Sequence, residues 1–180
     1  MEQFLVIIRG APASGKTTIA KLMRNFDIKV AWLKVDNFKE FFSGEASLTE
    51  QKYVDECALV TLNYLLENGF SVVMEKIFFD PFIIPLAVEA AHKRGIKIKV
   101  FQIKCPLEVL QDRDRNRPGI KEGCRKPMGD EAIKNIFEQL ERTYYQGAIE
   151  LDTVKLLPEE CVKKISEELT ERGNVYNSVL

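Results

Sequence analysis

The sequence predicts an α/β protein in which helices cover both faces of one parallel sheet. Five apolar runs suited to buried strands alternate with segments whose apolar residues recur at helical spacing. The runs cover residues 4–9, 30–35, 70–74, 96–103 and 148–151. Strands separated by helices pair in parallel through right-handed crossovers. A glycine-rich segment between the first run and the first helical pattern supports the same class.

That segment, residues 10–17, reads GAPASGKT and fills every fixed position of the phosphate-binding pattern G-x-x-x-x-G-K-[ST]. Its glycines let backbone N–H groups point inward, and the following helix start adds positive potential. Lys16 is expected to reach the β- and γ-phosphates, Thr17 to bind Mg²⁺ and Thr18 to contact the α-phosphate. The alternative is a strand-to-helix turn that needs two glycines. The predicted nucleotide-binding residues are Gly10, Ala13, Ser14, Gly15, Lys16, Thr17 and Thr18.

The later helices have recognisable boundaries. Ser47 and Glu50 form a capping-box pattern before a long helix that ends before Gly69. Its predicted buried stripe is Val54, Cys57, Ala58, Thr61 and Leu65. Three prolines are placed to open helices and Gly95 to close one: Pro81, Pro106 and Pro158. Pro85 lies inside the third helical segment, so that helix either kinks or starts later.

Composition limits the class of protein. The 180 residues are 46% hydrophobic and 29% charged with a net charge of −1, which predicts one domain over 1–172 and a tail over 173–180. No apolar stretch suits a membrane helix, and the first strand begins too early for a signal peptide. The scattered cysteines and single His92 argue against zinc and Ser-His-Asp chemistry. We therefore expect a cytoplasmic protein, either a monomer or a homodimer.

Two carboxylates follow predicted strands, at the edge where α/β proteins bind ligands. Asp36 follows residues 30–35 and is the candidate base that takes a proton from an acceptor hydroxyl. Its alternative role is the N-cap of a helix over 37–42. Glu75 follows residues 70–74, where a carboxylate can bind Mg²⁺ or contact substrate. Its alternative is an ion pair with Lys76.

An arginine-rich segment over 112–126 carries a local charge of +3. Its prolines and glycines interrupt any helix, which favours a lid, about 116–129, that closes over phosphates and neutralises charge. Arg115 and Arg117 are candidate catalytic residues within or beside it, because the guanidinium fork suits phosphate. The alternative is a solvated helix end. Asp152 and Thr153 form either one wall of a base pocket or a capped turn.

With these features the sequence resembles the small P-loop kinases of the nucleoside-monophosphate-kinase-like fold, a group that includes shikimate, gluconate and polynucleotide kinases. The resemblance rests on GAPASGKTT, on Val35-Asp36-Asn37-Phe38, on residues 105–113 and on residues 149–153. It implies strand order 2-3-1-4-5, Arg113 near the adenine, and Arg115 or Arg117 on the γ-phosphate. Glu75 departs from the group, in which many members carry Asp.

The expected function is an ATP- and Mg²⁺-dependent phosphotransferase that acts on a hydroxyl of a small molecule or a nucleic-acid end. With so little net charge, we expect neither long nucleic acid nor membrane as a partner. The alternative is a nucleotide-binding ATPase or sensing module, or a toxin-like kinase controlled by a protein partner. Phe38, Phe41 and Phe42 would be the partner surface in that case, or otherwise a pocket wall or core edge.

Overall fold

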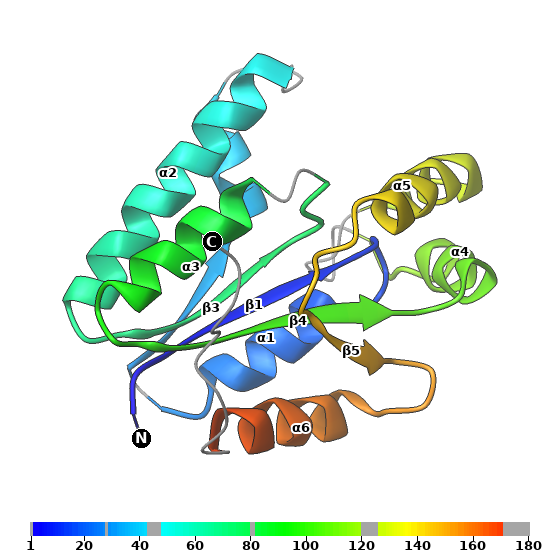
Figure 1. The fold of residues 1–180 in the computed structure, drawn as a ribbon. Coiled ribbons are helices and arrows are strands. Elements are labelled where there is room, and N and C mark those ends of the chain that lie inside the picture. The colour runs from blue at the N-terminus through cyan, green and yellow to red at the C-terminus, as the bar shows by residue number, and fades with distance from the viewer. Residues whose placement is uncertain (1, 28, 43–47, 80–81, 120–125, 171–180) are drawn as a thin grey trace.

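Five parallel strands form the sheet in the computed structural model, which describes residues 2–27, 29–42, 48–79, 82–119 and 126–170. The strands pair in the order β2-β3-β1-β4-β5 (Figure 1). They comprise β1 (Phe4–Gly10), β2 (Val30–Lys34), β3 (Ser71–Lys76), β4 (Lys97–Lys104) and β5 (Ile149–Asp152). The predicted parallel sheet and the order implied by the resemblance are both confirmed.

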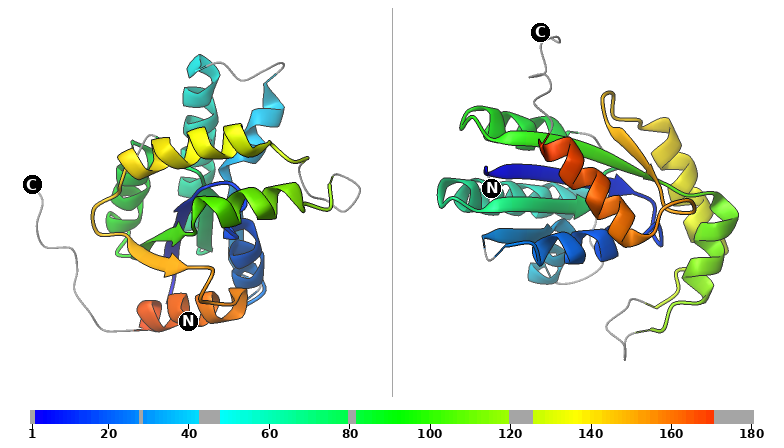
Figure 2. Two further views of the ribbon diagram at one scale, coloured as in Figure 1. Left: turned by 90° about the vertical axis from the view of Figure 1, so that its right-hand side faces the viewer. Right: turned by 90° about the horizontal axis from the view of Figure 1, so that it is seen from below.

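Helices cover both faces of this sheet (Figures 1 and 2). On one face lie α1 (Lys16–Arg24) and α6 (Pro158–Thr170), and on the other α2 (Leu48–Glu67) and α3 (Ile83–His92). A 3-10 helix, η1 (Val35–Phe41), follows β2 directly. The remaining pair, α4 (Leu107–Arg115) and α5 (Asp130–Arg142), lies side by side beyond the carboxyl end of β4. This end of the sheet is therefore walled by η1 on one side and by α4 and α5 on the other.

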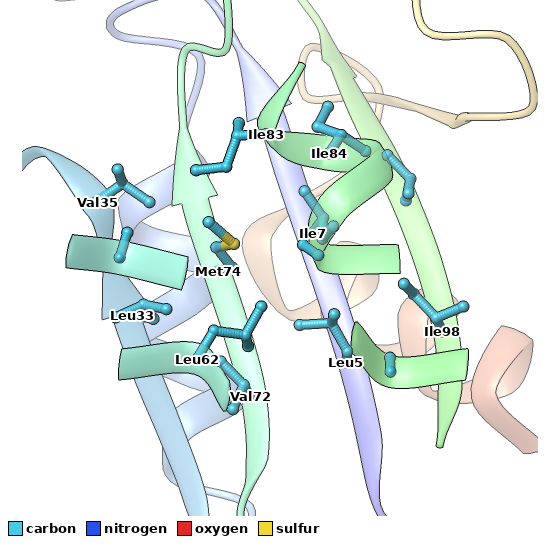
Figure 3. Packing of buried hydrophobic residues seen from close by; sticks show 14 of the residues in the cluster. Leu5, Ile7, Leu33, Val35, Leu62, Val72, Met74, Ile83, Ile84 and Ile98 are labelled. Carbon is cyan, nitrogen blue, oxygen red and sulfur yellow. The ribbon is translucent and has the colours of Figure 1, made fainter. Parts of the chain in front are cut away.

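The central strand β1 is buried along its whole length because both of its faces are covered. Leu5 and Ile7 point to the α2 and α3 side, where they pack with Leu62, Met74 and Ile84 (Figure 3). Phe4, Val6 and Ile8 point to the α1 and α6 side. Each such apolar side chain contributes about 1.5–3 kcal/mol through burial. The two cores fix β1, and with it the start of the phosphate loop.

Helix α2 ends as its glycine predicts. Gly69 has φ 78°, its N–H donates to the Leu66 carbonyl at 3.2 Å, and the Phe70 N–H donates to the Leu65 carbonyl at 3.0 Å. This is the paired hydrogen-bond pattern of a Schellman C-cap. The fully buried stripe is Val54, Ala58, Leu62 and Leu66, whereas three residues of the predicted stripe are only half-buried: Cys57, Thr61 and Leu65. Ser47 lies outside the described residues.

Several elements differ from the sequence prediction. Helix α3 starts at Ile83, so Pro85 falls in its first turn, where a missing N–H leaves no intrahelical bond unmade. Strand β3 runs two residues further than predicted, which places Glu75 within the strand. Helix α5 was not predicted. Pro81, residues 120–125 of the predicted lid and the predicted tail lie outside the described residues. Among the described helices, none combines the length and apolarity needed to cross a membrane.

Candidate active site

A cavity of about 350 Å³ opens at the carboxyl ends of β1, β2 and β3, beside the carboxyl end of α4. It collects residues from segments far apart in the sequence, and most of the predicted site residues line it. They are Ala13, Gly15, Lys16, Thr17, Thr18, Asp36, Glu75, Arg113 and Arg117. Three other predicted site residues, Gly10, Ser14 and Arg115, are not among the lining residues. The lining carries five cationic and two acidic side chains, so its net charge suits an anionic ligand.

The phosphate loop has the backbone geometry that its glycines predict. Gly15 has φ 99°, and a Cβ at Gly10 would lie 3.0 Å from the Ile103 Cβ and 3.1 Å from the Ile103 carbonyl oxygen. Ala13 also adopts a left-handed conformation, with φ 62°. Lys16 is nearly buried, and its Nζ donates to the Ala11 carbonyl at 2.7 Å. The phosphate loop thus curls around the Lys16 side chain, which binds a carbonyl group of the same loop.

Thr17 and Glu75, the two predicted metal ligands, lie together. The Thr17 hydroxyl donates to Glu75 Oε1 at 3.0 Å, and Glu75 is 3% exposed. Within the described part of the chain, no three His, Cys, Asp or Glu side chains gather as a self-contained metal site. A hydroxyl and one carboxylate beside a phosphate loop nevertheless fit Mg²⁺, which takes few protein ligands and completes its shell with water and phosphate. Lys76 turns to the opposite face and pairs with Asp55 of α2, so the alternative pairing of Glu75 with Lys76 is absent.

Asp36 lies in the first turn of η1 and is 12% exposed at its side chain. Its Oδ1 pairs with Lys39 Nζ at 2.7 Å, one turn along the same helix. The helix begins at Val35 with Lys34 as its N-cap, so the alternative role of Asp36 as an N-cap is wrong. Nearby, Phe38 and Phe42 pack against the core, whereas Phe41 is 74% exposed.

Arg113 connects the cavity with the loop that follows β5. Its Nη1 donates to Thr153 Oγ1 at 3.0 Å and its Nη2 to the Thr153 carbonyl at 2.8 Å. The Thr153 hydroxyl in turn donates to the Ser14 carbonyl at 3.0 Å. Next to them burial raises the pKa of the Cys105 thiol, an effect that the Arg113 charge opposes. Asp152 accepts the Val154 N–H at 2.9 Å, which lowers the pKa of its carboxyl group and caps the turn.

The same loop borders a second cavity of about 460 Å³, next to the first. Arg113, Thr153 and Pro158 line it together with the amino end of α1. Its position on the β5 side separates it from Asp36, which lines only the first cavity. Thr153 therefore combines both alternatives of the sequence analysis, because it is part of a cavity wall and its neighbour Asp152 caps a turn.

The two candidate lid arginines have different surroundings. Arg115 is half exposed and its Nη1 donates to both carboxylate oxygens of Asp130, at 2.9 and 2.7 Å. Arg117 lines the cavity, and its Nε lies 3.0 Å from Asp114 Oδ1. Asp114 is fully buried, and its Oδ2 accepts the N–H groups of Met128 and Gly129 at 2.7 and 3.0 Å. One carboxylate thus joins the end of α4 to the start of α5 and holds Arg117.

A fully buried arginine lies on β1 itself. Arg9 is fully buried, and its Nη2 donates to the Phe78 carbonyl at 3.1 Å and to Thr143 Oγ1 at 3.2 Å. Desolvation lowers the pKa of this guanidinium. Phe78 itself has φ 55°, a conformation that costs energy in a residue with a bulky side chain. Arg9 thereby fixes the segment after β3, whose Ile77 lines the cavity.

Sequence reasoning assigned no site role to two cationic lining residues, Lys21 and Lys34. Lys21 lies one helical turn after Thr17, and that spacing was the available signal for it. Lys34 directly precedes the expected strand end. Ile77 directly follows β3 and Met128 lies in the predicted lid, and the tertiary arrangement brings both to the cavity.

A phosphate loop after the central strand of a sheet in this order, with two helices beyond β4, is the fold of the small P-loop kinases. The sequence also matches the family model AAA_33, described as an AAA domain, over residues 5–146. The chain therefore belongs to this family. No curated protein matches it.

Several solved structures have a similar fold. The Mycobacterium tuberculosis APS kinase CysC in complex with AMPPNP and APS shares 16% identity at a TM-score of 0.65, covering 94% of this chain and 99% of that one. A sugar kinase from a Janibacter species shares 16% identity at a TM-score of 0.68, covering 93% and 94%. The Pnkp1/Rnl/Hen1 RNA repair complex shares 22% identity at a TM-score of 0.62, covering 79% of this chain and 46% of that one.

Proposed function

We propose that this protein transfers the γ-phosphate of ATP to a hydroxyl group of an acceptor. The observation that carries the proposal is a single cavity lined by the phosphate-loop Lys16, the Thr17–Glu75 pair and the Asp36 carboxylate. These are the parts that phosphoryl transfer requires: a phosphate cradle, a metal position and a base. Similar folds in an APS kinase and a sugar kinase support the proposal.

On the donor side, the loop N–H groups and the start of α1 would bind the phosphates. Lys16 exchanges its bond to the Ala11 carbonyl for phosphate oxygens. Thr17 and Glu75 would hold Mg²⁺, which neutralises phosphate charge when bound. Arg113 and the second cavity beside Thr153 would receive the adenosine. Arg117, which lines the cavity, would neutralise charge on the transferred group, whereas Arg115 pairs with Asp130 and does not line the cavity.

On the acceptor side, Asp36 would accept the proton of the attacking hydroxyl. Lys39 holds the carboxylate at 2.7 Å, which fixes its direction before the acceptor arrives. Asp36 and the second cavity lie on opposite sides of the phosphate loop, so donor and acceptor can approach the γ-phosphate from opposite directions. In-line transfer requires this arrangement.

The test compares Asp36→Asn with the unchanged protein, using ATP, Mg²⁺ and a panel of sugars, nucleosides and 5′-hydroxyl oligonucleotides. Transfer should fall about 10²- to 10⁴-fold while ATP affinity, measured by calorimetry, stays the same. The exposed Asp27→Asn is the matched control. Transfer that survives Asp36→Asn would remove Asp36 from the base role. ATP binding without turnover on any acceptor would favour the sensing alternative, for which the exposed Phe41 offers a contact surface.

A further inference from the structure

Three cationic side chains converge on the single tryptophan at the β2 edge of the cavity. The Nζ of Lys21, the Cζ of Arg24 and the Nζ of Lys34 lie 5.8, 5.8 and 5.9 Å from the centre of the Trp32 ring. Lys21 and Arg24 come from α1, and Lys34 shares a face of β2 with Trp32. We call Lys21, Arg24 and Lys34 the cation cluster. Because each cation lies within 6 Å of the ring centre, any two of them are less than about 12 Å apart, and their charges repel.

Two carboxylates, Asp36 and Glu75, line the same cavity, but neither is ion-paired with the cation cluster within the described part of the chain. None of the three cations makes an ion pair there, although many other lysines and arginines do. Glu75, the neighbour of Lys34 on β3, accepts the Thr17 hydroxyl instead. The Trp32 ring offers each cation a modest attraction at these distances. A concentration of unpaired positive charge beside a cavity suits an anionic ligand.

The place of the cluster connects it with the acceptor. Lys21 and Lys34 line the same cavity as Asp36, whereas the second cavity lies on the β5 side and holds neither of them. Lys16, Arg113 and Arg117 are already available for the nucleotide. The two lysines therefore supply positive charge on the β2 side that the donor does not require.

We propose that the acceptor carries phosphate and that the cation cluster binds this phosphate while the acceptor hydroxyl faces Asp36. The proposal rests on the proposed transfer to a hydroxyl. Two kinds of acceptor have this chemistry. One is a small phosphorylated molecule, and the other is the 5′-hydroxyl end of a short nucleic-acid strand, whose backbone phosphates follow the hydroxyl. Arg24 does not line the cavity. It therefore extends the cation cluster beyond the cavity, away from the position of the reacting groups.

Trp32 provides a direct readout, since it is the only tryptophan. Its fluorescence would be titrated with inorganic phosphate, thymidine 3′-monophosphate, 5′-hydroxyl pentathymidylate and the uncharged methylphosphonate form of that pentamer. We expect saturable changes with the phosphate-bearing probes and none with the methylphosphonate. Equal affinity for the monophosphate and the pentamer identifies a small acceptor. Affinity that rises with length identifies a strand end.

Charge removal then tests the individual residues. For the pentamer, the slope of log affinity against log salt should be about −2 and should lose about 0.7 in magnitude with each of Lys21→Gln, Arg24→Gln and Lys34→Gln. If the acceptor is small, Lys21→Gln and Lys34→Gln should each lower the affinity for thymidine 3′-monophosphate about fivefold. Lys163→Gln on α6 is the matched control, because its side chain is 79% exposed and remote from the cavity.

Kinetics separate the cluster from the donor site. With a phosphate-bearing acceptor, the lysine variants should raise the acceptor KM about fivefold and leave the ATP KM unchanged. A rise in the ATP KM alone, or a fluorescence response equal for charged and uncharged pentamers, would overturn the proposal. A retained fluorescence response without any phosphoryl transfer would overturn the proposed function and leave the anion site standing.

Discussion

Replacement of Asp114 by asparagine tests how the two helices beyond β4 are held together. The carboxylate is fully buried, accepts two backbone N–H groups and pairs with Arg117. Hydrogen bonds to a charged group contribute about 1.5–3 kcal/mol and neutral ones about 0.5–1.5 kcal/mol. Neutralisation should therefore cost about 1 kcal/mol for each N–H bond, and loss of the Arg117 pair should add up to about 1 kcal/mol.

The expected total is about 2–3 kcal/mol against local opening of the junction between α4 and α5. Amide hydrogen exchange of a peptide that contains Met128 and Gly129 measures this directly, and exchange should accelerate roughly 30- to 140-fold. Asp112→Asn is the matched control, since its side chain is 65% exposed on the same helix. Unchanged exchange in Asp114→Asn, or equal acceleration in the control, would refute the role of this carboxylate.

Three further changes test the donor side. Gly10→Ala should destabilise the fold by about 1–3 kcal/mol, because the new methyl group would meet Ile103 at 3.0 Å, and an unchanged urea midpoint would contradict this steric account. Thr153→Val keeps the side-chain shape but removes the hydroxyl between Arg113 and Ser14, so ATP affinity by calorimetry should fall about tenfold with little change in Tm. Glu75→Gln should raise the Mg²⁺ concentration for half-maximal turnover, and an identical Mg²⁺ dependence would exclude this carboxylate from the metal site.

Local patterns predicted the backbone geometry of the phosphate loop. The spacing of Gly10, Gly15 and Lys16 specifies a loop whose geometry depends on consecutive residues, and the structure has that geometry. Likewise Gly69 determines the end of α2 through contacts within six residues. The order of the strands, by contrast, came from the resemblance, because alternating runs alone are compatible with several orders of a parallel sheet.

Features that depend on tertiary packing were harder to predict. Arg115 and Arg117 were not distinguished by the sequence, whereas in the structure Arg117 pairs with the buried Asp114 and lines the cavity and Arg115 pairs with Asp130. Helix α5 was not predicted, although Ile133, Phe137 and Leu140 recur in it at helical spacing. Lys21 and Lys34 converge because α1 packs against the edge strand, which no local pattern specifies.

The hydrogen bond from Thr153 to Ser14 joins residues 139 positions apart. During synthesis the phosphate loop emerges before the residue that braces it, which follows 139 positions later. A nascent chain that lacks β5 therefore carries the complete GAPASGKT segment but not the brace on its backbone. Tight nucleotide binding should accordingly appear only at the end of folding, so that ATP, once bound, stabilises the finished domain and not its earlier intermediates.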